Sequence, residues 1–490
     1  MSRRMHACRL AVFTAILVAA GSAAATDFPA TPPAPGPAPR LSVPTPSTQT
    51  LANGLRVVSV RRAGLPLVTA QLIVRSGGEM DPPALAGLAD LTANLLSKGA
   101  AGKSAPQIAA AAEALGGSLD AAAGWDESAV GITVTTPKLA QALGLLAEVV
   151  RQPDFSAEEL KRAQAQALDD LRLTLSRPTA LASLAASRGV FGDGAYGHSR
   201  GGTPASIARI GRADVQRLHA ALYRPDNAIL VLAGDITPAQ AQQLAQASFG
   251  DWAKPATLLP ARPAGKAASQ LPAVVLIDQR GAGQAGVVAA HAAPSRGDDG
   301  YYVGTLANAV LGGSYSARLN EEIRIKRGLS YGAGSNLMPR RDAGLWLASA
   351  QTKNPSAAPV VELMLGEFKR LGSTRVSADE LAARKATLIG GYGRSLETTA
   401  GLAEQVGELA VYGVPLGEIG KYIEQVQAVT PKQVQKYADK HLDAGAGTVV
   451  VVGDAAQFAA GIRKAHPQAV LLEATALDLD SPTLQPAGRK

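Results

Sequence analysis

The chain has 490 residues, of which 47% are hydrophobic and 18% charged, and its net charge is +8. A chain of this length and hydrophobic content can bury more than one core, which excludes global disorder. The basic residues are dispersed along the chain. They do not form blocks interleaved with aromatic residues, so no nucleic-acid partner is expected.

The N-terminal segment has the pattern of a secretory signal peptide. Three arginines among the first nine residues precede an apolar run from Leu10 to Ala20, and small residues follow up to Ala25. The run is shorter than the about 20 apolar residues of a membrane-spanning helix, and no other stretch qualifies as a membrane span. We therefore expect residues 1–25 to be a signal peptide and the mature protein to be exported, either periplasmic or secreted.

Cysteine chemistry is not expected in the mature protein. Cys8 is the only cysteine, and it lies ahead of the apolar run of the signal peptide. Cleavage would remove it. The mature chain would then have no disulfide, no thiolate metal site and no cysteine nucleophile.

Proline-rich segments divide the mature chain into parts. Residues 26–47 contain eight prolines, and we interpret them as a poorly ordered leader. A second proline-rich segment, residues 254–272, is interpreted as a linker between two halves of similar length, 48–253 and 273–475. Residues 476–490 form a tail with little pattern. The sequence therefore predicts two domains.

The two halves repeat the same succession of elements. Each ends in a helix followed by a buried strand that closes on Gly-Asp, at Ala228–Asp235 and at Thr448–Asp454. Each also has a Ser-x-x-Glu capping box that opens a long helix, at Ser156 and at Ser377. The predicted fold class is α+β, with two homologous domains that each have a mostly antiparallel sheet and helices packed on one face.

Three segments resemble the pitrilysin/insulinase metallopeptidases, a family that includes mitochondrial processing peptidase. They are Gly197–Ile207, Tyr223–Asp235 and Leu311–Tyr331, and the resemblance covers about residues 48–475. It implies two homologous domains that form half of a clamshell, and zinc-dependent peptide hydrolysis as the activity of the family. The family's metal motif is His-x-x-Glu-His on a helix, in which the histidines bind zinc and the glutamate activates the zinc-bound water.

The sequence lacks this metal motif. Asp90 and Asn94 stand where the two histidines align, Ala93 replaces the glutamate, and Asp170 aligns with the third ligand. In addition, no two of the six histidines are spaced as a helical pair. We therefore expect no zinc site and no cofactor bound by this chain. Asp90, Asn94 and Asp170 are interpreted as a polar remnant, with an oxygen-ligand site for Ca²⁺ or Mg²⁺ as the alternative.

Arg324 and Tyr331 match the arginine and tyrosine that the family's second domain contributes to the active site. Gly328 is predicted to end the helix of Arg324, and Ser330 to begin the next strand, which would place the guanidinium beside the phenol. The resemblance implies that the arginine binds a peptide carbonyl and that the tyrosine hydroxyl donates to the developing oxyanion. The alternative is a surface salt bridge between Arg324 and a residue such as Glu321, with Tyr331 as a rim residue.

These observations predict a non-catalytic subunit of a zinc metallopeptidase. The chain would supply Arg324 and Tyr331 to a peptide substrate, and a homologous partner subunit would carry the zinc in a heterodimer. The first alternative is a peptide-binding or assembly protein with no role in hydrolysis. A weaker alternative is independent catalysis with another metal at Asp90, Asn94 and Asp170.

The segment after Gly116-Gly117 is a further candidate for peptide binding. Asp120, Trp125 and Asp126 lie in what we predict to be an edge strand. An extended peptide can add to the edge of a sheet through main-chain hydrogen bonds. An ordinary sheet edge is the alternative, and the sequence favours neither.

Overall fold

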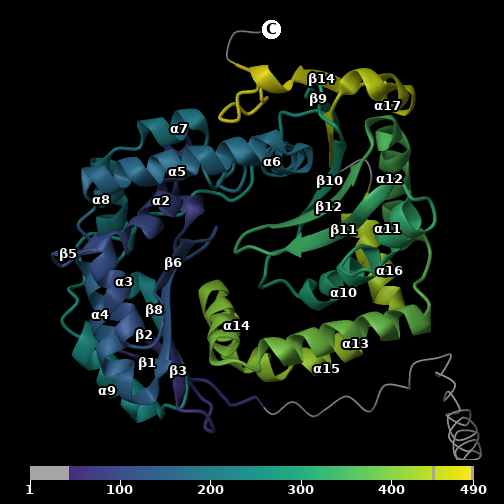
Figure 1. The fold of residues 1–490 in the computed structure, drawn as a ribbon. Coiled ribbons are helices and arrows are strands. Elements are labelled where there is room, and N and C mark those ends of the chain that lie inside the picture. The colour runs from purple at the N-terminus through teal and green to yellow at the C-terminus, as the bar shows by residue number, and fades with distance from the viewer. Residues whose placement is uncertain (1–42, 444–446, 487–490) are drawn as a thin grey trace, which may run out of the picture. The chain divides into compact units, whose positions relative to one another are not determined.

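The computed structural model describes residues 43–443 and 447–486 (Figure 1). The predicted signal peptide and most of the predicted leader, residues 26–47, therefore lie outside the described residues. Within the described residues, no helix has the length and apolar character that a membrane span requires.

The first half of the chain forms a six-stranded sheet with the strand order β1-β2-β8-β3-β7-β6. Its strands are β1 (Ser47–Thr50), β2 (Arg56–Arg61), β3 (Leu67–Val74), β6 (Asp120–Ala123), β7 (Ser128–Thr135) and β8 (Ala228–Gly234). Only β2 and β8 pair in parallel, and the other neighbours are antiparallel. The predicted last strand of this half, β8, lies inside the sheet between β2 and β3.

The second half forms a matching six-stranded sheet with the order β11-β12-β10-β13-β9-β14. Its strands are β9 (Val274–Asp278), β10 (Ala285–Ala293), β11 (Ser330–Met338), β12 (Gly344–Thr352), β13 (Thr448–Gly453) and β14 (Val470–Glu473). Five strands repeat the order and directions of the first sheet, with β11 in the place of β6. Only the outermost strand differs, because β14 is parallel to its neighbour and β1 is antiparallel. The predicted duplication is confirmed.

Helices follow the same order in both halves. Those of the first half are α2 (Leu88–Leu95), α3 (Ala105–Ala114), α4 (Leu139–Arg151), α5 (Ala157–Ser176), α6 (Pro178–Phe191), α7 (Pro204–Arg209), α8 (Arg212–Leu222) and α9 (Pro238–Phe249). Those of the second are α10 (Tyr301–Leu311), α11 (Arg318–Asn320), the π-helix η5 (Glu321–Ile325), α12 (Ala357–Ser373), α13 (Ala378–Ser395), α14 (Thr399–Tyr412), α15 (Tyr422–Ala428), α16 (Pro431–His441) and α17 (Ala459–Ala465). A two-stranded ribbon, β4 (Gly99–Ala100) and β5 (Lys103–Ser104), lies between α2 and α3.

The serines of the two predicted capping boxes cap long helices, but the glutamates do not complete the boxes, because Glu159 pairs with Arg162 and Glu380 with Arg318. The Ser156 hydroxyl accepts a hydrogen bond from the backbone N–H of Glu159 (3.2 Å) at the start of α5. The Ser377 hydroxyl accepts one from the N–H of Glu380 (3.1 Å) at the start of α13. Each serine thus satisfies one of the N–H groups that a helix leaves free at its N-terminus.

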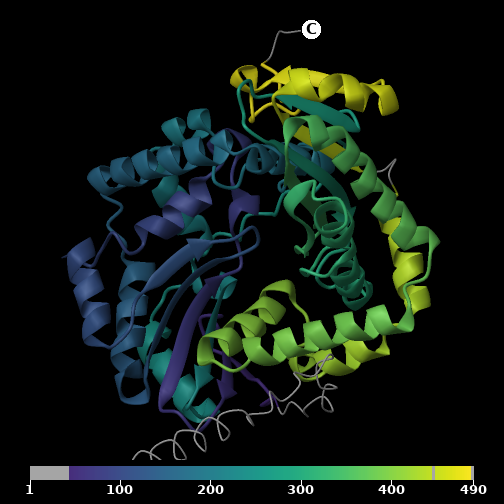
Figure 2. The ribbon, with the colours of Figure 1, turned by 45° about the vertical axis from the view of Figure 1, so that its right-hand side comes forward.

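Each half contributes one helix to the sheet of the other half. The predicted helices cover one face of each sheet, with α4 and α9 on the first sheet and α12 and α16 on the second. The opposite face of the first sheet is covered by α14 from the second half, and that of the second sheet by α6 from the first half. Figure 2 shows α14 beside the strands of the first sheet. Strands β8 and β13 are buried on both faces, which explains why their sequences are unbroken apolar runs and not alternating ones.

The turn between β11 and β12 inserts into the first half of the chain through Arg341. Its guanidinium donates to the Glu79 carboxylate (3.2 Å) and to the backbone carbonyls of Asp126 (2.7 Å) and Arg75 (3.2 Å). Its backbone N–H donates to the Asp126 carboxylate (3.0 Å). One arginine therefore binds two buried acids of the other half.

Arg340, next to it, packs its guanidinium against aromatic rings. The distances from its Cζ to the three ring centroids lie between 4.4 and 4.7 Å for Trp125, Phe191 and Tyr196. A desolvated guanidinium over aromatic faces is a favourable cation–π arrangement. Together, the two arginines fix the β11–β12 turn to the first half.

Glu79 makes the stability of this contact depend on pH. Burial raises the pKa of Glu79 from 4.5 to about 7, although the N–H of Gly77 and the charge of Arg341 oppose the shift. The folded state therefore holds a proton that the unfolded state releases, so the stabilisation is present below the ordinary pKa and is lost as the pH rises through about 7. We expect the urea midpoint of the wild-type chain to fall between about pH 5 and about pH 7.5 more steeply than that of Glu79→Gln. Equal pH dependence of the urea midpoint in the wild type and Glu79→Gln would contradict this expectation. Glu113→Gln, a variant at an exposed position, is the control and should behave like the wild type.

The predicted linker and tail both pack against the first half. In the linker, residues 254–272, the carbonyls of Ala264 and Gly265 accept hydrogen bonds from the loop that follows α6. In the tail, Leu484 is buried in the core beside α6, and the Asp480 carboxylate accepts from the Thr203 hydroxyl (3.0 Å). The predicted domain boundaries themselves stay predictions.

Candidate functional site

Arg324 and Tyr331 lie on either side of a helix-to-strand corner. Arg324 belongs to the π-helix η5, which continues from α11. Gly328 follows with φ +61°, a left-handed conformation that glycine adopts at helix ends, and its N–H donates to the Arg324 carbonyl (2.9 Å). Strand β11 then begins at Ser330. The predicted corner is confirmed, and π-helical turns are frequent at functional sites.

The guanidinium of Arg324 packs against two exposed tyrosine rings. Its Cζ lies 5.2 Å from the ring centroid of Tyr331 and 4.9 Å from that of Tyr315. Tyr331 is 88% exposed and Tyr315 is 65% exposed. The structure thus brings the two predicted residues together and adds Tyr315, which the sequence analysis missed. The sequence could have indicated Tyr315, because it is an aromatic residue two positions after the Gly312-Gly313 turn and lies within Leu311–Tyr331, which resembles the family.

Within the described residues, the side chain of Arg324 has no carboxylate partner. Glu321, the salt-bridge partner considered above, lies 3.9 Å from the Nζ of Lys326 instead. Glu322 pairs with Lys326 (2.6 Å) and with Arg327 (2.5 Å). The salt-bridge alternative for Arg324 is therefore wrong. A guanidinium has five N–H donors, and those of Arg324 remain available to a ligand.

A groove with a volume of about 620 Å³ opens beside this arginine. Its walls are the backbone of β11 from Tyr331 to Asn336, the Gly312-Gly313 turn, and Thr179 at the start of α6. Both halves of the chain thus contribute to it. Arg324 is the arginine that lines this groove.

Asp90, which aligns with the first metal ligand of the family, binds the guanidinium of Arg200. Asp90 on α2 accepts a hydrogen bond from the Nη1 of Arg200, which also donates to the Ala123 carbonyl at the end of β6. Burial raises the pKa of Asp90 to about 6, and the charge of Arg200 opposes this rise. Arg200 therefore supplies the positive charge next to this buried carboxylate.

The other aligned positions provide little to a metal. Asn94 is exposed, and the exposed carboxylate of Asp170 accepts from the amide of Gln166 on the same helix (3.0 Å). Among residues 43–443 and 447–486, no group of three or more His, Cys, Asp or Glu side chains could hold a metal ion. These residues do not fit a zinc ion, because they include no His or Cys, the ligands that dominate zinc sites in proteins, and because Asp90 already binds the guanidinium of Arg200.

We expect the purified chain to contain no stoichiometric zinc, calcium or magnesium. The reason is that a metal at Asp90 would have to displace the guanidinium of Arg200. Elemental analysis by plasma mass spectrometry, with the Asp90→Asn variant alongside, measures the metal content. One equivalent of metal in the wild type that disappears in Asp90→Asn would contradict the expectation.

The predicted edge strand is only partly as expected. Asp120 does lie in β6, at the edge of the first sheet. The prediction is wrong for Trp125 and Asp126, because the strand ends at Ala123. Asp126 is fully buried, and its carboxylate accepts from the Tyr196 hydroxyl (2.6 Å). Trp125 packs edge-on against the same tyrosine. Both residues therefore belong to the contact between the halves.

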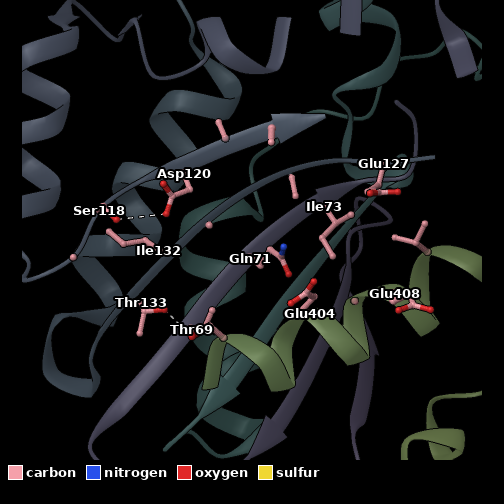
Figure 3. Close-up of a pocket in the computed structure, with 18 of the residues that line it drawn as sticks. Thr69, Gln71, Ile73, Ser118, Asp120, Glu127, Ile132, Thr133, Glu404 and Glu408 are labelled. Carbon is pink, nitrogen blue, oxygen red and sulfur yellow. Dashed lines mark hydrogen bonds between the residues drawn. The ribbon is translucent and has the colours of Figure 1, made fainter. Parts of the chain in front are cut away.

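A cavity with a volume of about 1300 Å³ lies between the first sheet and α14 (Figure 3). Edge strand β6 contributes Asp120, and α14 contributes Glu404 and Glu408. Glu408 pairs with Arg296 (2.6 Å). The cavity has room for a segment of extended peptide next to the edge of the sheet.

Known protein families match both halves of the chain. Residues 56–192 match the family described as Insulinase (Peptidase family M16). Residues 209–388 match the domain described as Peptidase M16 inactive domain. The two matches together include both the helix of Asp90 and the corner of Arg324 and Tyr331.

The curated relatives include bacterial proteins of similar length. An uncharacterized zinc protease of Streptomyces coelicolor is 24% identical over 392 residues, which are 79% of this chain and 85% of the relative. An uncharacterized zinc protease of Mycobacterium tuberculosis is 26% identical over 402 residues, which are 81% of this chain and 90% of the relative.

Two solved structures share the fold. A peptidase M16 inactive domain from Pseudomonas fluorescens has a TM-score of 0.77 and 29% identity, covering 83% of this chain and 98% of the other. A protease from Helicobacter pylori has a TM-score of 0.80 and 18% identity, covering 84% of this chain and 100% of the other.

Proposed function

Because the chain belongs to the insulinase family of peptidases, peptidase family M16, and carries no His-x-x-Glu-His motif, we propose that it is the zinc-less subunit of a zinc metallopeptidase. A homologous partner subunit would carry the zinc, and this chain would supply Arg324 and Tyr331 to the bound peptide. The observation that carries the proposal is the guanidinium of Arg324, which packs against Tyr331 and Tyr315 and has no carboxylate partner among the described residues.

The proposed roles follow from the donors that the two side chains offer. The planar fork of Arg324 can donate two hydrogen bonds to carbonyl oxygens of an extended peptide. The hydroxyl of Tyr331 can donate to the carbonyl oxygen as it becomes an oxyanion during hydrolysis. The zinc ion of the partner would activate the attacking water.

The exposure of Tyr331 supports the need for a partner. A hydrogen-bond donor stabilises an oxyanion most strongly where water is excluded, since water screens the charge. Tyr331 is 88% exposed in the single chain. A second subunit over the groove would exclude water from the hydroxyl of Tyr331.

Export is part of the proposal. The pattern of residues 1–25 is that of a signal peptide, and a partner would have to share the compartment of this chain. We expect a C-terminally tagged full-length chain to be recovered from the periplasm or the medium. Its mature N-terminus, read by sequencing, would begin after residue 25, whereas an uncleaved N-terminus would contradict export by this route.

The proposal is tested by co-expression with homologous exported chains that carry the intact metal motif. We expect one such pair to form a complex on size-exclusion chromatography and to hydrolyse labelled casein peptides faster than either chain alone. Arg324→Ala combined with Tyr331→Phe should leave the complex intact and remove most of the activity. Unchanged activity of every active complex that carries this double variant would overturn the proposal.

A peptide-binding protein with no role in hydrolysis is the second candidate. The cavity of about 1300 Å³ favours it, because β6 offers an unpaired sheet edge within a single chain. This candidate predicts that peptide binding persists in the Arg324→Ala, Tyr331→Phe variant, and that no partner confers hydrolysis.

A further inference from the structure

We propose that Tyr315 is a third residue of this site, where it orients the guanidinium of Arg324 and forms a subsite for an uncharged, apolar side chain of the peptide. The inference rests on the proposed function and names the kind of substrate that the site prefers. Three features support it: the fixed loop of Tyr315, the lining of the groove, and the open space at Gly332.

The loop that carries Tyr315 is held on both sides by one buried arginine. Arg384 of α13 donates from Nη1 to the hydroxyls of Ser314 (3.0 Å) and Ser316 (2.8 Å). Its Nη2 also donates to the Ser316 carbonyl. A charged hydrogen-bond donor that is buried and shared by both neighbours of Tyr315 leaves this loop little freedom.

Asn320 fixes the same loop to strand β11. Its buried side-chain amide donates to the Tyr315 carbonyl (2.6 Å), and its oxygen accepts from the N–H of Ala333 (3.2 Å). Gly312 adds a direct contact, since its carbonyl accepts from the N–H of Ser335 (3.0 Å). A Cβ at Gly312 would lie only 2.2 Å from that nitrogen, so this approach requires glycine.

Tyr315 is therefore a large aromatic side chain on a loop that hydrogen bonds hold in place, and most of its ring is exposed. Burial in the hydrophobic core does not account for this position, because Tyr315 is 65% exposed. A rigid exposed aromatic residue offers contact area to a ligand at little cost in conformational entropy. Its ring also limits the motion of the Arg324 guanidinium, 4.9 Å away.

The lining of the groove defines what it would bind. Arg324 is the only Arg, Lys, Asp or Glu side chain among the described residues that line it, and most of the others are Gly, Ala or Ser. A basic side chain would find no carboxylate there, and its desolvation would be uncompensated. An aromatic or long aliphatic side chain could instead lie against the ring of Tyr315.

Gly332 keeps the groove open next to Tyr331. An added Cβ at this position would meet no atom within 4 Å, and its φ lies outside the left-handed region. Neither packing nor backbone conformation therefore requires glycine here. A larger side chain at position 332 would fill the groove without disturbing the fold.

The test measures the binding of three defined peptides to the full chain by fluorescence polarisation. Each probe is a fluorescein-labelled peptide of about ten Ala, Ser and Thr residues, with Phe, Gly or Lys at its centre. We expect the wild type to prefer the Phe probe. Tyr315→Ala and Gly332→Leu should each weaken its binding roughly tenfold and remove the preference over the Gly probe, whereas Tyr315→Phe should bind like the wild type.

Two variants serve as matched controls. Leu173→Ala removes a side chain that is also 65% exposed, and Gly297→Leu adds one at another glycine with open space around it. Neither residue lines the groove. Both should bind all three probes like the wild type, and thermal melts should show that all variants fold. If Gly332→Leu fails to fold, the binding of the Phe probe by Tyr315→Ala alone tests the inference.

The outcomes separate this inference from the proposed function. Wild-type binding of the Phe probe by Tyr315→Ala, or no binding by the wild-type chain, would overturn the inference and leave the co-expression result unaffected. Unchanged activity of complexes with Arg324→Ala and Tyr331→Phe would overturn the proposed function, whatever the probes show. A preference for the Lys probe would overturn the assignment of an apolar subsite.

Discussion

Replacing Tyr331 by phenylalanine is expected to lower kcat of the assembled peptidase by about 10²- to 10³-fold and to leave KM nearly unchanged. The substitution removes the hydroxyl that would donate to the oxyanion, an interaction made only in the transition state. The ring stays, and with it the surface that lies 5.2 Å from the guanidinium of Arg324. Ground-state binding of the peptide should therefore persist. Steady-state kinetics of the co-expressed complex measures both constants.

Tyr315→Phe is the matched control for this experiment. It removes the same single oxygen from a second ring against the same guanidinium, at 4.9 Å. We expect kcat and KM of this variant to stay at the wild-type values, because only the ring of Tyr315 is used. Equal losses in the two variants, or an unchanged kcat in Tyr331→Phe, would contradict the assigned role of the Tyr331 hydroxyl.

Replacing Arg341 by alanine is expected to destabilise the chain by about 3–5 kcal/mol, which is typical of breaking a buried ion pair. Arg341 donates to the carboxylate of Glu79 and lies 3.5 Å from that of Asp126. The side chains of these acids are 3% and 0% exposed. Without the guanidinium, Asp126 would remain buried without its cation, and Glu79 would keep only Arg262, 3.8 Å away. Urea unfolding followed by circular dichroism gives the change in unfolding free energy.

A second variant tests this explanation. Arg341→Met combined with Asp126→Asn removes the guanidinium together with the charge of the fully buried Asp126 and keeps most of the volume, so it should be more stable than Arg341→Ala. Arg280→Ala serves as the control, since Arg280 pairs with Asp278 at the surface and its loss should leave the midpoint unchanged. Similar midpoints for Arg341→Ala and Arg280→Ala would show that the insertion of the β11–β12 turn contributes little.

The elements that sequence predicts best are those defined by short-range patterns. Gly328 ends the turn of Arg324 and Ser330 starts β11, as the spacing predicts, because a helix stop and a strand start are local features. The same holds for the serine caps of α5 and α13. The place of Arg324 beside Tyr331 follows from this corner alone.

Contacts between distant segments could not be predicted from the sequence. The approach of Tyr315 to Arg324 depends on a loop that Arg384 holds from a helix far along the chain. Similarly, the sequence predicts the loss of the metal motif at Asp90, but the spacing of residues does not indicate that Arg200 binds its carboxylate. Such pairs depend on tertiary structure, and the local pattern around either partner does not indicate them.

The exchange of α6 and α14 has a consequence for how such a chain could arise. A polypeptide with one half alone would leave one face of its sheet uncovered and one of its own helices without a surface to pack on. Two copies of that half would satisfy each other by swapping the helix, as in a domain-swapped dimer. The present chain has the architecture of such a dimer joined into one polypeptide. In a fused chain the two copies are always in reach of each other, and after duplication each can change separately.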